Sequence, residues 1–71
     1  MSDSNIEHGI YEFLKARHVA GLHYLNVHAH NGIAELRGLA DSTMVRKLCV
    51  ECCRRVTGVR QVIDMLEVTM A

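Results

Sequence analysis

The stretch Leu25-Asn-Val-His-Ala-His-Asn-Gly-Ile-Ala-Glu-Leu-Arg-Gly38 decides the fold of this chain. Apolar and polar residues alternate on both sides of Asn31-Gly32, a pattern typical of two antiparallel strands joined by a two-residue turn. A type I′ turn needs positive φ at both central positions, and Asn and Gly adopt this conformation most readily. The stretch therefore predicts a β-hairpin with Asn31 and Gly32 at its tip.

The two-residue loop also predicts the register of the hairpin. The inner face then holds three apolar pairs, which are Ala29/Ala34, Val27/Leu36 and Leu25/Gly38. The outer face is mostly polar and holds His28/Glu35 and Asn26/Arg37. A slip of one residue would mix the two faces, so the pattern and the turn agree on one register.

A helix is predicted before the hairpin, over residues 4–18. Its apolar stripe comprises Ile6, Ile10, Phe13 and Leu14, at helical spacing. Ser4 and Glu7 have the spacing of a capping box, which would fix the start of the helix. Gly21 is a candidate for the residue that ends the helix or links it to the hairpin.

A second helix is predicted from a cap at Asp41 or Ser42 to about Thr57, with Gly58 as the left-handed residue that ends it. Its apolar stripe comprises Val45, Leu48, Cys49, Cys52 and Val56. Cys53 lies at the edge of this stripe, so we expect its thiol to be the most reactive of the three.

A last strand is predicted from about Val59 to Thr69. The side chains of Val62, Leu66 and Val68 share one side with Asp64, and those of Ile63 and Met65 take the other. The order helix, strand, strand, helix, strand predicts an α+β fold, an αββαβ two-layer sandwich with both helices on one face of a three-stranded sheet. We expect a single domain over residues 4–69, after a polar tail of residues 1–3.

Composition excludes several classes of protein. Eight basic and eight acidic residues give a net charge of zero, which weighs against strong attraction to nucleic acid. No apolar run approaches the ~20 residues that cross a bilayer, and no signal peptide is recognisable. Three cysteines in one helical segment suit reduced thiols, so we expect a cytoplasmic location, or a periplasmic or membrane-associated one if the chain is part of a longer protein.

The chain also resembles the BON domain, a family named for bacterial osmotically inducible and nodulation proteins. The residues that carry the resemblance are Val27-His-Ala-His-Asn31-Gly32-Ile-Ala34-Glu-Leu36-Arg-Gly38, Asp41-Ser42, Val56-Thr-Gly58-Val59, Val62 and Leu66-Glu-Val68. The resemblance runs from about Ile6 to Val68. It implies two helices against a mixed sheet and a binding module without cofactors, which attaches to phospholipid membranes or to envelope proteins.

Basic residues gather on the second helix and give the first candidate site. They are Arg46, Lys47, Arg54 and Arg55. Such a face could contact lipid phosphate or an acidic partner protein. The alternative is an ordinary solvated helix face, with an ion pair between Lys47 and Glu51.

His28 and His30 give a weaker candidate. Alternate residues of a strand point the same way, roughly 7 Å apart, so two imidazoles there could hold zinc, copper or nickel. Glu35 lies opposite His28, whereas His23 has the wrong parity to join without a bulge. Structural zinc usually has four ligands, so we interpret both histidines as polar surface residues and predict no metal site.

A second kind of function would use the outer sheet face. The residues expected there include Tyr24, Ile33, Leu39, Ile63 and Met65. An apolar sheet face could serve a protein-interaction module or a weak homodimer. Cys49-x-x-Cys52 fills apolar helix positions, which favours core packing over redox chemistry. No catalytic motif and no platform for stacking RNA bases is present, so we expect neither an enzyme nor a nucleic-acid partner.

The turn generates a testable prediction. Gly32→Val should lower the melting temperature more than a valine substitution at an exposed strand residue, because a β-branched side chain is strained at positive φ. Equal melting temperatures for the two variants would mean that the turn is not type I′.

Overall fold

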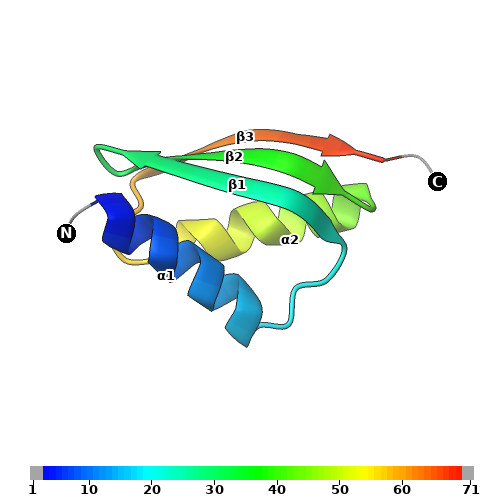
Figure 1. Cartoon of the computed structure of the whole chain (residues 1–71), viewed down its shortest axis with the longest axis horizontal. Helices are drawn as coiled ribbons and strands as arrows, with labels where there is room; N and C mark the ends of the chain where they lie inside the picture. Colours follow the sequence, from blue (N-terminus) through cyan, green and yellow to red (C-terminus); the bar gives the residue numbers. More distant parts are fainter. Residues whose placement is uncertain (1–2, 70–71) are drawn as a thin grey trace.

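The computed structural model describes residues 3–69 and has the predicted order of elements (Figure 1). These are α1 (Asp3–Ala16), β1 (Leu22–His30), β2 (Ile33–Ala40), α2 (Thr43–Arg54) and β3 (Gln61–Val68). The sheet has the order β1-β2-β3, with β1 antiparallel and β3 parallel to the central strand β2. Both helices lie against one face of the sheet and leave the other face bare. The predicted αββαβ two-layer sandwich is therefore confirmed.

The hairpin turn also holds the start of β3. Asn31 and Gly32 have φ of 51° and 78°, the signs that a type I′ turn requires. The backbone N–H groups of Arg60 and Gln61 donate to the carbonyl oxygen of Gly32, at 2.7 and 3.3 Å. A Cβ at position 32 would lie 2.8 Å from Cδ of Arg60 and 3.1 Å from the carbonyl oxygen of Gly58. Gly32 thus serves the turn and the close approach of the chain that enters β3.

A bulge in β1 overturns the predicted pairing of Leu25 with Gly38. The predicted register holds from His30/Ile33 to Asn26/Arg37, but the next pair is His23/Leu39. Two residues of β1, Tyr24 and Leu25, therefore lie opposite the single residue Gly38.

Backbone geometry explains why glycine faces this bulge. Tyr24 has a φ of 56° and Gly38 a φ of 142°. A Cβ at Gly38 would lie 2.9 Å from the carbonyl oxygen of His23 and 3.0 Å from that of Tyr24. The bulge can approach β2 this closely only because position 38 has no side chain.

Both helices end earlier than predicted, and α1 also begins one residue earlier. α1 begins at Asp3, so Ser4 lies inside the helix and not at its cap. Its last residue is Ala16, and the left-handed residue that follows is His18, with a φ of 53°, whereas Gly21 lies in the link to β1. The N–H of Val19 donates to the carbonyl of Leu14 and that of His18 to the carbonyl of Lys15, both at 3.1 Å. This is the hydrogen-bond pattern of a Schellman motif with His18 in the glycine position.

α2 is capped by Ser42, one of the two predicted residues, whose Oγ accepts from the N–H of Val45 at 3.1 Å. The helix ends at Arg54, before the predicted Thr57. The N–H of Arg55 bonds to a carbonyl three residues back, which tightens the last turn. Gly58, with a φ of 97°, lies in a separate turn before β3, so its predicted place at the end of the helix is wrong.

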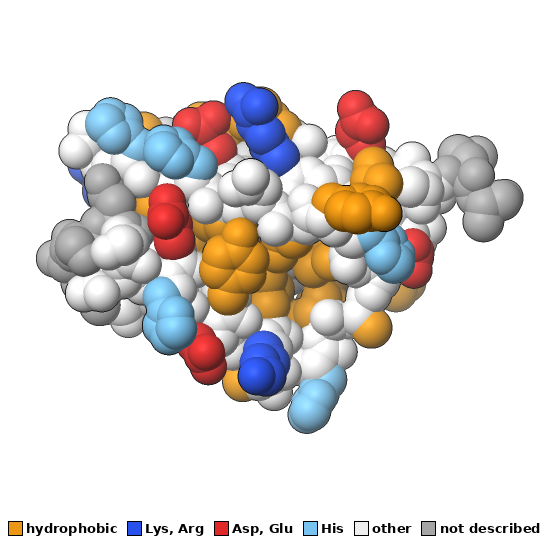
Figure 2. Space-filling model, in the orientation of Figure 1, with side chains coloured by type: hydrophobic (Ala, Val, Ile, Leu, Met, Phe, Trp, Pro, Cys, Tyr) orange, Lys and Arg blue, Asp and Glu red, His pale blue; other side chains and the backbone are white. Residues whose placement is uncertain are grey.

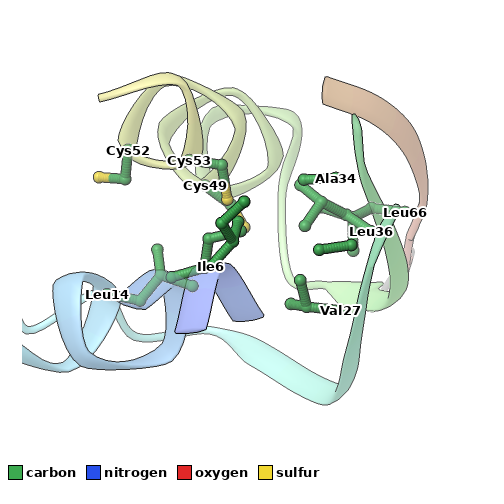
Figure 3. Close-up of a cluster of buried hydrophobic side chains, with 11 residues drawn as sticks. Ile6, Leu14, Val27, Ala34, Leu36, Cys49, Cys52, Cys53 and Leu66 are labelled. Carbon is green, nitrogen blue, oxygen red and sulfur yellow. The ribbon is translucent and has the colours of Figure 1, made fainter. Parts of the chain in front are cut away.

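The core lies between the two helices and the sheet (Figure 3). Its buried hydrophobic residues are Ile6, Ile10, Leu14, Val27, Ala29, Ala34, Leu36, Ala40, Cys49, Cys52, Cys53 and Leu66. Leu48, predicted for the core, is 48% exposed, whereas Cys53 is 0% exposed. α2 packs against both the sheet and α1, so Cys49 and Cys53 lie on its buried side and Leu48 does not.

Burial and a shared hydrogen bond govern the thiols of Cys49 and Cys53. This bond lowers the pKa of Cys49 and, together with burial, raises the pKa of Cys53, which keeps its proton. Figure 3 shows Cys52 directed away from this pair. Cys52 is 6% exposed and the other two cysteines are 0% exposed, so the predicted position of Cys53 at the edge of the apolar stripe is wrong. The thiolate is the reactive form, and it needs access to the reagent.

Thiol labelling of the native protein should follow this order. Cys52 should react first with a bulky disulfide reagent, and Cys49 and Cys53 should react only after unfolding. Cys52→Ser should remove the reaction of the folded protein, whereas Cys53→Ser should leave it. Loss of the native reaction in Cys53→Ser alone would contradict the packing described here.

The bulge predicts the effect of a second glycine substitution. Gly38→Ala should reduce the free energy of unfolding by about 1–3 kcal/mol, because the methyl group meets two carbonyl oxygens at a strained φ. Gly9→Ala is the matched control, since its Cβ meets only the side chain of Val56, at 3.3 Å. Denaturant unfolding measures both variants. A loss in Gly9→Ala as large as that in Gly38→Ala would rule out the bulge as the cause.

Candidate binding surfaces

The four predicted basic residues of α2 do not form one patch. Arg46 lies on the flank of the helix beside β3, where its Nε is 3.4 Å from Oδ2 of Asp64. Lys47 and Arg54 are exposed, and Nη1 of Arg54 is 3.2 Å from Oε1 of Glu51. Glu51 therefore forms its ion pair with Arg54. The pair between Lys47 and Glu51, which the alternative interpretation predicted, is not the one formed.

A shallow depression of about 380 Å³ brings Arg54 together with Arg60. The other residues that line it are Val59, Gln61 and Val62, from the segment that enters β3. Two guanidinium groups thus stand beside small apolar side chains at the C-terminal end of α2.

A second depression, of about 270 Å³, brings Arg55 together with Arg17. Val19, Leu48, Glu51 and Cys52 complete its lining. The guanidinium carbon of Arg17 also lies 5.0 Å from the centre of the Phe13 ring, a cation–π contact that directs this side chain. Sequence reasoning missed Arg17 as a site residue, because only the packing of α1 against α2 brings it to Arg55.

The histidines of β1 contact different partners. His28 and His30 are exposed, and His28 pairs with Glu35 across the strands. Nδ1 of His28 is also 3.9 Å from Oε2 of Glu7. The bulge places His23 opposite Leu39, and Nε2 of His23 is hydrogen-bonded to Oδ1 of Asp41 at 2.8 Å. Within residues 3–69, no three His, Cys, Asp or Glu side chains are grouped to hold a metal ion.

The bare face of the sheet is mixed in character. Figure 2 shows histidine, charged and hydrophobic side chains interspersed along the sheet side of the molecule. One depression of about 310 Å³ is lined by Asn26, His28, Glu35 and Arg37. A neighbouring one, of about 490 Å³, is lined by Arg37, Gly38, Leu39, Met65 and Glu67. Arg37 therefore stands between two hollows of the outer face.

Side chains occupy the free edge of β1. The N–H of Ala29 donates to Oε2 of Glu7 at 2.8 Å, and the N–H of Val27 donates to the hydroxyl oxygen of Tyr11 at 3.1 Å. The hydroxyl of Tyr11 in turn donates to the carbonyl of Leu25 at 3.3 Å. An added strand would have to displace these groups of α1.

The free edge of β3 is protected in a similar way. Gln61 and Thr69 direct their N–H groups to β2, so the even-numbered residues between them direct theirs outward. The outward N–H of Leu66 donates to Oδ1 of Asp64 at 2.9 Å, and Arg46 holds the same carboxylate. Arg46, predicted for a binding surface, thus helps to hold the carboxylate that occupies the edge of β3.

Comparison with known proteins identifies the family of this chain. No helix in the described part of the chain is both long and apolar enough to cross a bilayer. No curated protein matches the sequence. The family model of the BON domain matches residues 2–70, essentially the whole chain. The resemblance noted from the hairpin and the last strand is confirmed, and the chain belongs to the BON domain family.

Proposed function

We propose that this BON domain is a non-enzymatic module that attaches to a phospholipid surface through the arginines around the C-terminal half of α2. Membership of the family supports a lipid-binding or membrane-binding module in general terms. The observation that carries the more specific proposal is the grouping of Arg54 with Arg60 and of Arg17 with Arg55 in two depressions, which the successive residues Arg54 and Arg55 line.

Guanidinium groups suit the phosphate of a lipid headgroup. Each presents several N–H donors in a plane that matches two phosphate oxygens at once. Four arginines gather here although the chain as a whole has no net charge. Glu51 lines the depression of Arg17 and Arg55, and its carboxylate is already paired with Arg54. The local charge therefore favours an anionic surface.

Apolar side chains in the same place favour a membrane over a soluble phosphate. Leu48 is 48% exposed beside Arg55, although it was predicted for the core. An exposed leucine between arginines can enter the boundary between headgroups and acyl chains while the charges stay at the phosphates. Membrane contact thus explains why Leu48 is exposed, whereas core packing does not.

Co-sedimentation with vesicles tests the proposal. The domain should bind vesicles that contain phosphatidylglycerol at low salt, and should bind neutral phosphatidylcholine vesicles much less. Arg54→Glu/Arg55→Glu should lower the partition onto anionic vesicles by at least about tenfold, since each basic residue near such a surface contributes about 1 kcal/mol. High salt should weaken the binding, because it screens exposed charges.

A matched control uses the other side of the domain. Arg37→Glu reverses a charge on the outer sheet face and should leave vesicle binding unchanged at low protein concentration. Arg37→Glu changes the net charge half as much as the double variant, so a loss of binding free energy half as large would point to net charge in place of this surface. Absence of binding by the unaltered domain at low salt would disprove the proposal.

A further inference from the structure

The outer face of the sheet is laid out in four rows by the register of β2 and β3. From one end to the other the rows are Ile33/Gln61, Glu35/Ile63, Arg37/Met65 and Leu39/Glu67. The two middle rows each hold one charged residue on β2 and one apolar residue on β3. Ile63 and Met65 are each 37% exposed. An apolar path curves from Ile33 on β2 through Ile63 and Met65 on β3 back to Leu39 on β2, and it encloses one acid and one base on β2.

This arrangement is complementary to itself. A two-fold axis parallel to the sheet, perpendicular to its strands and between the two middle rows would place β2 against β2 of a second copy, in antiparallel direction. The rotation reverses the order of the rows. Glu35 would then face Arg37 of the second copy, Ile63 would face Met65, and Ile33 would face Leu39. Two ion pairs and four apolar contacts result from one operation, as an isologous interface requires.

Other two-fold arrangements of the same face lack this match. An axis parallel to the strands along β2 would place Glu35 on Glu35 and Arg37 on Arg37, which repel each other. Edge-to-edge pairing is opposed by Glu7 and Tyr11 on β1 and by Asp64 on β3, which already bind the outward N–H groups. The charges and the edges therefore select the same arrangement.

We infer that two copies of this chain associate face to face through the outer sheet surface, with Glu35 of each copy on Arg37 of the other. The hollow lined by Asn26, His28, Glu35 and Arg37 receives the guanidinium group of the second copy. The second copy covers the outer face of β2 and β3, which neither helix covers. The interface uses the side opposite the helices, so it does not depend on the proposed membrane attachment.

The size of the face sets the strength of the association. Eight residues at about 3.3 Å each and three strands about 4.8 Å apart give a face of roughly 26 by 14 Å. Counted on both copies this is roughly 730 Å², which is less than a stable specific interface buries and suits a weak, transient one. The dimer is therefore weak and dissociates at micromolar concentrations, because the interface is small and its central charges lose water when they pair.

Sedimentation equilibrium over a wide range of concentration tests the inference. The unaltered chain should pass from monomer to dimer as its concentration rises. Glu35→Arg alone and Arg37→Glu alone should each weaken self-association by about tenfold or more, because two symmetry-related attractions become repulsions. An equimolar mixture of the two variants should form a heterodimer, since each introduced charge then faces an opposite one.

Two further variants separate the interface from general effects of charge. The double exchange Glu35→Arg/Arg37→Glu should restore self-association, which a folding defect would not allow. Lys47→Glu, on the helix side, should leave it unchanged. A chain that stays monomeric at the highest concentration would overturn the inference. So would single variants that self-associate like the unaltered chain, or a mixture that stays monomeric.

Discussion

The hydrogen bonds from Arg60 and Gln61 to the carbonyl of Gly32 are the contact on which the rest of the sheet depends. The turn of the hairpin sets the register of β1 and β2. β3 follows α2 in the chain, so no short turn sets its register against β2. Its first N–H groups find their acceptor at the tip of the hairpin, and the parallel pairing then proceeds residue by residue from Ile33/Gln61 to Ala40/Val68. The rows of the outer face and the inward position of Leu66 both follow from this start.

Much of this could be predicted from the sequence, for a physical reason. Alternation along residues 25–38 and the Asn31-Gly32 turn are local signals, and local signals give the hairpin, the helices and their order. Local signals could not predict the bulge, because tyrosine seldom adopts the positive φ that Tyr24 has. The sequence pattern placed Gly38 at the end of a strand. The backbone of β1 shows instead that Gly38 makes room for two residues, Tyr24 and Leu25.

The candidate site was less predictable than the fold. A helical wheel placed Leu48 in the core and Cys53 at its edge, whereas the orientation of α2 depends on two neighbours at once, α1 and the sheet. The same limit applies to charge. Arg46 belongs to a sheet edge, and Arg17 joins Arg55 across two helices. Residues far apart in the sequence make these contacts, so a single stretch of sequence carries no sign of them.

The side chains that occupy the edge of β1 also have a consequence for the order of folding. The hairpin is local and can form within microseconds. Glu7 and Tyr11, however, reach its edge only when α1 has docked. Until then the backbone of Val27 and Ala29 is open to any other extended chain, and this makes the interval before docking the period of greatest risk of aggregation. The helix that precedes the hairpin in the sequence emerges first during synthesis, so it is present before that edge exists.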